Sequence, residues 1–358
     1  MGGTDYVKKG VRLMIKLGKV IGCDCPVFIA ETAHNQHILI EGDSGSGKTT
    51  AIRQISKNLC MEGSRVLALN VNGSFGDITD KDGYFSIIHA KKDGIPLPIL
   101  ECLEMSDGTR ENLDDVAEAV VEVFSQAGRM GYEQRYLLSQ AAREAVVLRE
   151  SCTDDMSCLK KVLAGMSDDK GKILLAKFAP LLERVRFQSG SGLWTKGGAV
   201  VLDLSGYQQW VQLLIAQLVM SILWRQSRAE GQHGSNATWL VVDEFQNYSL
   251  RQDSVLEQIL REGRKFKLSL ILGTQSLTAF ETKKRAILQQ SATKLYFRPV
   301  ESDLRRIANV FPDMSPADAR AILQGLRVGE CLASGEFTIG RETMHRTLKI
   351  NFQIKYEI

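Results

Sequence analysis

Apolar residues along the chain gather into short runs, which alternate with longer segments in which an apolar residue returns every three or four positions. A short continuous apolar run is typical of a strand buried on both faces, and the periodic segments are typical of helices. Buried strands are expected at His37–Glu41, Arg65–Val71, Ala199–Leu204, Leu240–Asp243, Leu268–Leu272 and Lys294–Arg298. Because helices separate these strands, the pattern predicts an α/β fold with a largely parallel sheet that is covered on both faces.

The interval between the second and third strands is long and mostly helical. Its first apolar stripe at helical spacing consists of Val116, Ala119, Val120, Val123 and Phe124. We interpret the region of about 110–190 as a helical insertion on the core, with a separate domain as the alternative. Helices are expected at Thr50–Leu59, Tyr132–Glu150, Val211–Trp224, Leu250–Glu262, Glu301–Val310 and Ser315–Leu326.

Both ends of the chain carry short strand-like segments. Within residues 1–36, Val11–Ile15 and Lys19–Ile29 predict a short β-hairpin ahead of a core that spans 37–358. A terminal hairpin or meander is expected from Gly329–Ser334, Glu336–Ile339 and Met344–Phe352, with turns at Gly335 and Gly340. The C-terminal end is therefore expected to be antiparallel.

The stretch Gly42–Thr49 reads GDSGSGKT and matches the phosphate-binding loop pattern G-x-x-x-x-G-K-[ST]. It lies between a predicted strand and a predicted helix, which is the context that this loop requires. Glycines let successive N–H groups point at phosphate oxygens, Lys48 can reach the β- and γ-phosphates, and Thr49 offers a hydroxyl to Mg²⁺. The candidate nucleotide-binding residues are Gly42, Asp43, Ser44, Gly45, Ser46, Gly47, Lys48, Thr49 and Thr50. The alternative is a glycine-rich surface turn.

Two carboxylates end the apolar run Trp239–Glu244, which reads WLVVDE. Ligands of open α/β sheets bind at the carboxyl ends of the strands, so Asp243 is expected to face the phosphates and to hold Mg²⁺ through water together with Thr49. Glu244 is the candidate general base for the attacking water. The alternative is a strand that ends in ordinary solvated acids.

The following strand, Leu268–Leu272, leads into Gly273-Thr274-Gln275-Ser276. A glutamine at a neighbouring strand tip can sense the γ-phosphate and orient water, so Gln275 is a candidate catalytic residue. Arg261 and Arg264 precede this strand, and either could act as an arginine finger toward an adjacent subunit. We favour Arg264, with a surface salt bridge as the alternative. For Arg305 and Arg306 we expect a solvated helix face, with a position near the nucleotide or the neighbouring subunit as the alternative.

Taken in order, GDSGSGKT, WLVVDEFQNY, LREGRKFKLSLILGTQS and ATKLYFRPVESDLRRIANVF resemble the HerA/FtsK superfamily of DNA-pumping ATPases, above all HerA and the ATPases of conjugation and type IV secretion. The resemblance implies a RecA-like ASCE core, a homo-hexameric ring, ATP and Mg²⁺ as ligands, and movement of double-stranded DNA or, less often, of protein. On the matching positions it implies phosphate and magnesium binding by Lys48 and Thr49. It also implies the roles already given to Asp243, Glu244, Gln275 and Arg264.

Two features depart from this family. Full-length HerA-type proteins carry a β-barrel ahead of the core, and the residues before Gly42 suffice only for a remnant hairpin. Asn70-Val71-Asn72-Gly73 stands where relatives commonly place an aspartate. Two alternative functions stay open: a conjugation- or secretion-type motor that moves protein or nucleoprotein, and a nucleotide-gated assembly factor that recruits a nuclease or other effector.

Composition adds only weak limits. The 358 residues carry a net charge of +3 and have a sequence pI of about 8.4, which neither favours nor excludes nucleic acid. Short basic runs at Lys91-Lys92 and Lys283–Arg285 could contact DNA phosphates non-specifically, with solvated loops as the alternative. Seven scattered cysteines lack zinc-like spacing and are expected to be reduced thiols. No apolar segment is long enough to span a bilayer and no signal peptide is visible, so a cytoplasmic location is expected.

Overall fold

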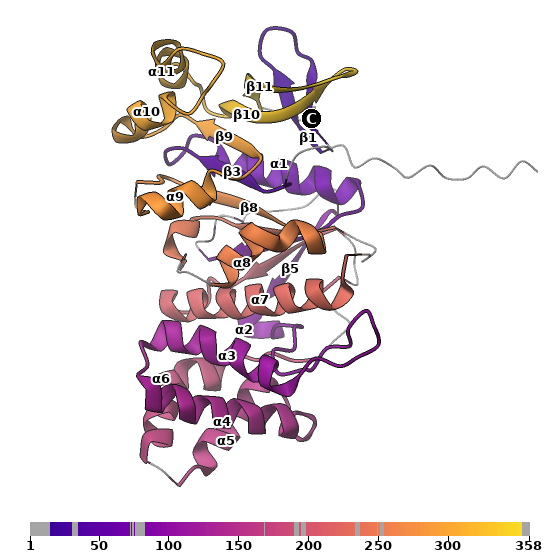
Figure 1. The fold of residues 1–358 in the computed structure, drawn as a ribbon, viewed down its shortest axis with the longest axis vertical. Helices are drawn as coiled ribbons and strands as arrows, with labels where there is room; N and C mark the ends of the chain where they lie inside the picture. The colour runs from indigo at the N-terminus through magenta and orange to yellow at the C-terminus, as the bar shows by residue number, and fades with distance from the viewer. Residues whose placement is uncertain are drawn as a thin grey trace, which may run out of the picture.

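A single mixed sheet of eleven strands organises the computed structural model, with the strand order β11-β1-β2-β10-β9-β3-β8-β7-β4-β6-β5 (Figure 1). The structure describes residues 15–30, 35–71, 73, 75, 83–167, 169–189, 193–194, 198–232, 237–248, 250, 254–278 and 280–352. One half of the sheet is parallel and the other half is antiparallel. The two halves meet at the pairing of β9 with β10.

The parallel half confirms all six strands expected from the apolar runs. They are β3 (Ile38–Glu41), β4 (Arg65–Asn70), β6 (Ala199–Asp203), β7 (Thr238–Val242), β8 (Leu268–Thr274) and β9 (Thr293–Phe297). A further strand, β5 (Phe85–His89), pairs with β6 at the sheet edge and was not expected. Because all these strands are parallel, their carboxyl ends share one edge of the sheet.

The antiparallel half corrects two expectations about turns. β10 (Glu330–Ile339) is one continuous strand that pairs with β11 (Glu342–Asn351) through a turn at Gly340, so the expected turn at Gly335 is wrong. At Gly335 a Cβ would lie 2.8 Å from the carbonyl oxygen of Ala292, which shows that this glycine permits close packing of strands. The N-terminal hairpin consists of β1 (Lys16–Val20) and β2 (Pro26–Ile29), and the expected strand residues 11–14 lie outside the described residues.

Alternate residues of the central strands separate two cores on opposite faces of the sheet. On one face, helix α1 (Lys48–Met61) buries Ala51, Ile52 and Ile55 against Ile38 and Ile40 of β3. On the other face lie the long helix α7 (Gln209–Glu230) and α8 (Val255–Glu262). The period of two in the strands therefore directs each apolar side chain to one of the two helical layers.

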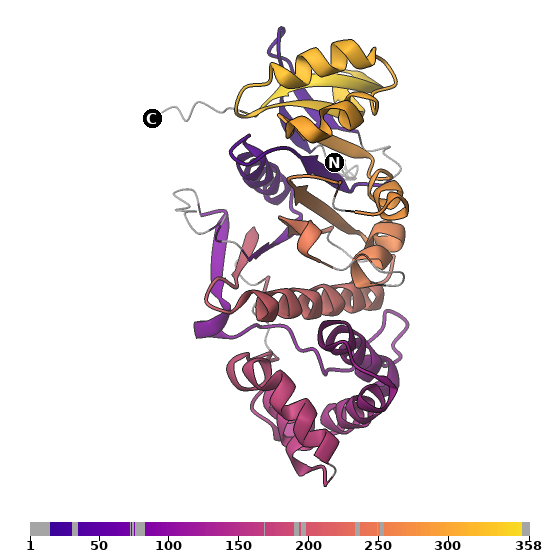
Figure 2. The same cartoon turned by 90° about the vertical axis from the view of Figure 1, so that its left-hand side faces the viewer.

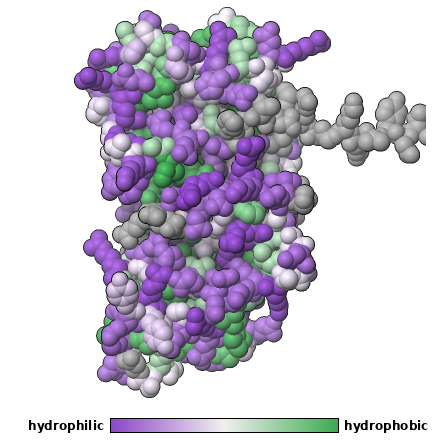
Figure 3. Space-filling view, in the orientation of Figure 1, coloured by the Kyte–Doolittle hydropathy of each residue, from purple (hydrophilic) through white to green (hydrophobic). Residues whose placement is uncertain are grey.

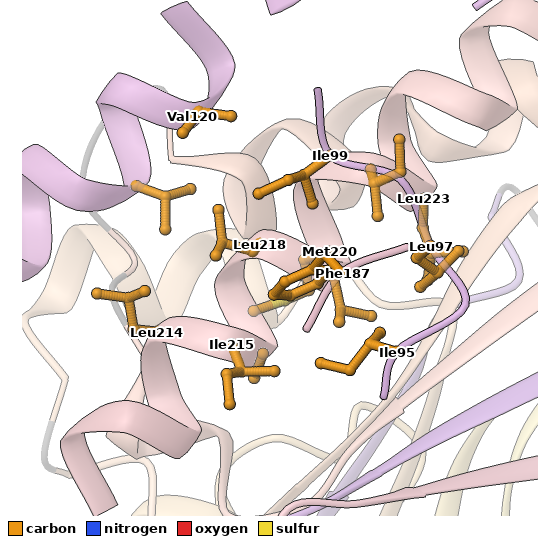
Figure 4. Close-up of a cluster of buried hydrophobic side chains, with 14 of the residues drawn as sticks. Ile95, Leu97, Ile99, Val120, Phe187, Leu214, Ile215, Leu218, Met220 and Leu223 are labelled. Carbon is orange, nitrogen blue, oxygen red and sulfur yellow. The ribbon is translucent and has the colours of Figure 1, made fainter. Parts of the chain in front are cut away.

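A group of helices extends from α7 at the end of the molecule opposite to the C-terminal elements (Figures 1 and 2). Its members are α2 (Ala90–Asp93), α3 (Leu113–Gly128), α4 (Tyr132–Leu148), α5 (Asp155–Gly165) and α6 (Asp169–Arg184). Leu214 and Leu218 of α7 pack among Val120 of α3 and Ile95 and Ile99 (Figure 4). The division of the chain into a hairpin, a core and an insertion stays a prediction.

Two C-terminal helices, α10 (Glu301–Ala308) and α11 (Pro316–Gln324), pack on their own small core. Helix α9 (Thr282–Leu288) instead buries Leu288 in the core that contains α7 and α8. Ser315 caps α11 by accepting a hydrogen bond from the N–H of Asp318, as the sequence predicts. The face in Figure 3 is mainly hydrophilic, with small hydrophobic patches. Among the helices within the described ranges, none combines the length and apolarity needed to cross a membrane.

Candidate nucleotide site

The phosphate-binding loop joins β3 to α1 at the carboxyl edge of the parallel strands. Gly45 and Gly47 have φ angles of 72° and 105°, a region that a residue with a side chain rarely adopts. A Cβ on Gly47 would also lie 2.6 Å from the backbone nitrogen of Gly329, which donates a hydrogen bond to the carbonyl of Ser46. The loop conformation therefore depends on glycine and on support from the start of β10.

Lys48 lies at the first position of α1 and folds back over the loop. Its ammonium group donates to the carbonyl oxygens of Gly42 at 2.8 Å and Asp43 at 2.9 Å. Burial lowers the pKa of Lys48, while the carboxylates of Glu244, Asp243 and Asp43 oppose that change. A buried cation that faces carboxylates and carbonyl oxygens is suited to exchange these partners for phosphate oxygens.

Thr49 and Asp243 meet across the sheet although 194 positions separate them: the hydroxyl of Thr49 lies 3.5 Å from Oδ2 of Asp243. β8 runs between β3 and β7 and brings Gly273 next to Asp243. A Cβ on Gly273 would lie 2.4 Å from Oδ1 of Asp243, so only glycine leaves room for this carboxylate. Gly273 could not be singled out from the motifs alone, because its role depends on a neighbouring strand.

Glu244 has left-handed backbone angles, with φ 52° and ψ 44°. For a residue other than glycine this conformation is costly, and such strain concentrates at functional sites. Its two carboxylate oxygens accept hydrogen bonds from Gln275, at 3.0 Å, and from Gln246. Gln246 also accepts a hydrogen bond of 2.8 Å from the hydroxyl of Thr274. The structure thus brings Glu244 and Gln275 together and adds Gln246, which sequence reasoning missed.

The two candidate finger residues lie apart from this set of contacts. Arg261 belongs to the last turn of α8, and Arg264 belongs to the short 3₁₀ helix Gly263–Phe266 that follows it. Both side chains are exposed. The choice between them stays a prediction.

The structure contradicts the expectation for Arg306. We expected it on a solvated helix face, but its guanidinium pairs with Oε1 of Glu41, which is only 1% exposed, and lies 3.5 Å from Oδ2 of Asp303. Arg305, its neighbour on α10, is exposed as expected. Burial raises the pKa of Glu41 to about 7, while Arg306 opposes this rise. The residue directly before Gly42 is thus tied to a C-terminal helix.

The comparisons with known proteins agree with this geometry. Residues 15–223 match the family described as "Helicase HerA, central domain", which is more than half of the chain. The chain belongs to this family. It is a HerA-like P-loop ATPase, and the resemblance drawn from the four motifs is confirmed.

One curated relative is the DNA double-strand break repair helicase HerA of Sulfolobus acidocaldarius, which is 23% identical over 341 residues. The match covers 90% of this chain and 66% of the relative, so the chain spans just under two thirds of that protein. A relative at this identity adds to the family assignment but does not carry over its activity.

Solved structures confirm the RecA-like α/β fold. VirB4 of Thermoanaerobacter pseudethanolicus aligns with a TM-score of 0.66 at 20% identity, over 96% of this chain and 97% of VirB4. The bacterial conjugative coupling protein TrwBdeltaN70 aligns with a TM-score of 0.63 at 13% identity, over 95% of this chain and 89% of the TrwBdeltaN70 chain. TrwB has been solved with the ATP analogue ADPNP and with ADP and Mg²⁺.

Proposed function

We propose that the chain is an ATP-hydrolysing motor of the HerA/FtsK type that moves double-stranded DNA. The observation that carries the proposal is the approach of Thr49 to Asp243, beside a Glu244 held by Gln275. A phosphate loop alone would support nucleotide binding. Here the loop that follows β3 meets Asp243 at the end of β7, with only β8 between the two strands. This pairing of the loop with an acid supports hydrolysis.

Each residue of the site has a task in this proposal. The loop N–H groups and Lys48 bind the β- and γ-phosphates. Thr49 and Asp243 would hold Mg²⁺, which keeps several waters and needs only one or two protein oxygens; when bound it neutralises phosphate charge. Glu244 takes the proton of the attacking water, and Gln275 orients that water.

The partners follow from the family. We propose a homo-hexamer in which Arg264 reaches the γ-phosphate bound by the adjacent subunit. Duplex DNA would be held through its phosphates, without base readout. A nuclease or other effector is a further candidate partner, and the cytoplasm is the proposed location. The name of the Sulfolobus relative supports DNA as the substrate.

A mass measurement, combined with an ATPase assay, tests the proposal. The molecular mass of the purified protein in solution is measured for the protein alone, with a non-hydrolysable ATP analogue, and with duplex DNA. ATP turnover is then measured with and without that DNA. We expect assembly with the analogue and faster turnover with duplex DNA, both absent in Lys48→Ala. Turnover that ignores DNA but responds to a partner protein would favour the secretion-type motor or the assembly factor. No turnover under any of these conditions would overturn hydrolysis itself.

A further inference from the structure

A group of buried and half-buried charged and polar side chains lies between the nucleotide site and helix α10. It consists of Glu41, Ser276, Asp303 and Arg306, which we call the α10 cluster. Glu41 ends β3, Ser276 follows β8, and Asp303 and Arg306 lie on α10. The cluster joins three segments that are far apart in the sequence, since Glu41 and Arg306 are 265 positions apart.

Burying these charged groups costs desolvation free energy. Asp303 is fully buried and Glu41 is 1% exposed. Oε2 of Glu41, Oδ1 of Asp303, and Nε and Nη1 of Arg306 are buried and have no hydrogen-bond partner among the described residues. Buried ion pairs are weak contributors to stability, and apolar side chains of similar volume often serve as well or better. The cluster therefore needs an explanation other than stability.

The contacts of the cluster suggest that explanation. Arg306 pairs with Glu41, and Glu41 directly precedes Gly42 of the phosphate loop. Oε1 of Glu41 also accepts a hydrogen bond of 3.0 Å from the N–H of Leu277. Asp303 accepts a hydrogen bond from the hydroxyl of Ser276, which directly follows Gln275. Helix α10 thus contacts both the residue that precedes the phosphate loop and the turn that follows Gln275, the residue that contacts Glu244.

We propose that Arg306 and Asp303 are positioning residues of the nucleotide site: Arg306 fixes the start of the phosphate loop through Glu41, and Asp303 fixes the Gln275 turn through Ser276. This inference rests on the proposed function. Helix α10 can act in this way because its other face is anchored: Leu304 and Ile307 pack in the C-terminal core with Leu332 of β10. The position of α10 is therefore set by the C-terminal elements and not by the loop.

The two links predict different kinetic defects, which a merely structural role would not produce. Arg306→Met releases the phosphate loop, so nucleotide affinity and KM should worsen by about tenfold, as for loss of one hydrogen bond to a charged group, while kcat changes by less than about threefold. Ser276→Ala releases the Gln275 turn, so kcat should fall by about tenfold with little change in KM. The matched control for Arg306→Met is Arg305→Ala, its exposed neighbour on α10.

A double variant guards against simple misfolding. Arg306→Met alone leaves Glu41 buried without its cation, whereas Glu41→Gln combined with Arg306→Met removes both charges. We expect the double variant to recover the melting temperature of the wild type but to keep the tenfold weaker binding of a fluorescent ATP analogue. Binding at the wild-type affinity would overturn the proposal, as would an equal defect in the Arg305→Ala control.

A readout without nucleotide separates this inference from the proposed function. Hydrogen exchange of the backbone amides in 42–49 should be faster in Arg306→Met than in the wild type, and unchanged in Arg305→Ala. If the wild type fails to hydrolyse ATP but this difference is seen, the proposed function fails and the positioning role stands. If the exchange of 42–49 is the same in all three proteins, the positioning role is refuted whatever the turnover.

Discussion

The Glu41→Gln substitution should change how the stability of this protein depends on pH. Burial raises the pKa of Glu41 from 4.5 to about 7 in the folded chain, with Arg306 opposing that rise. The carboxyl therefore keeps its proton in the folded state between pH 4.5 and 7, where the unfolded chain has released it. Because the folded state binds more protons in this window, the wild type loses stability as pH rises through it.

The expected loss follows from the pKa values. A pKa change from 4.5 to about 7 corresponds to about 3 kcal/mol at about 1.4 kcal/mol per unit. Glutamine does not titrate, and its oxygen can still accept from Leu277 and Arg306. The unfolding free energy of Glu41→Gln minus that of the wild type should thus increase by about 3 kcal/mol from pH 4.5 to 7 and stay constant outside this range.

The difference in unfolding free energy between Glu41→Gln and the wild type is a better test than the pH dependence of either protein alone. Burial lowers the pKa of His37 to about 4, so the folded state gains stability as pH rises from 4 to 6.5 and offsets the Glu41 effect in the wild type. This histidine is present in both proteins and cancels in the difference. Urea unfolding followed by tryptophan fluorescence at several pH values measures it. A difference that stays constant within about 1 kcal/mol would refute the reasoning.

Four further substitutions test the site. Lys48→Ala should abolish measurable nucleotide binding, checked with a fluorescent ATP analogue. Glu244→Gln should keep the analogue bound while turnover falls by at least about a hundredfold; normal turnover would remove Glu244 from its role. Gly273→Ala places a methyl group 2.4 Å from Asp243 and should weaken Mg²⁺-dependent turnover at least about tenfold, whereas Gly165→Ala, with open space around it, should leave turnover unchanged. Mixing Arg264→Ala with Glu244→Gln subunits should restore some activity, and the absence of rescue at every ratio would argue against action in trans.

Much of the fold could be predicted because buried parallel strands leave an uninterrupted apolar run in the sequence. β5 escaped prediction because the side chains of Phe85–His89 are only half-buried at the sheet edge or exposed, so the run is short and mixed. The turn at Gly335 was wrong because a glycine that allows two strands to approach is indistinguishable in sequence from one that bends a turn. Most helix boundaries agreed to within two residues, as for Tyr132–Leu148 against an expected end at Glu150. Helix α7, however, ends at Glu230, six residues beyond the expected end at Trp224, and α8 begins at Val255 where Leu250 was expected.

The residues of the candidate site likewise include some that could be predicted from the sequence and some that could not. Lys48, Thr49, Asp243 and Glu244 could be found because each stands in a contiguous motif with a known chemical task, although their tasks stay predictions. Gly273, Gln246 and the α10 cluster could not be found, since their contacts exist only after distant segments meet. Arg306 in particular has the sequence context of an ordinary charged helix, and only the fold places it against Glu41.

The antiparallel strands have a consequence for how the chain matures. β1, β2, β10 and β11 pair in a closed set, because β11 bonds to both β10 and β1. The N-terminal hairpin therefore waits for strands that lie more than 300 positions further along the chain, since Lys19 pairs with Asn351. Until those strands have been synthesised, β2 and β9 present open edges. A nascent chain of this protein is thus exposed to mispairing until β10 and β11 have left the ribosome.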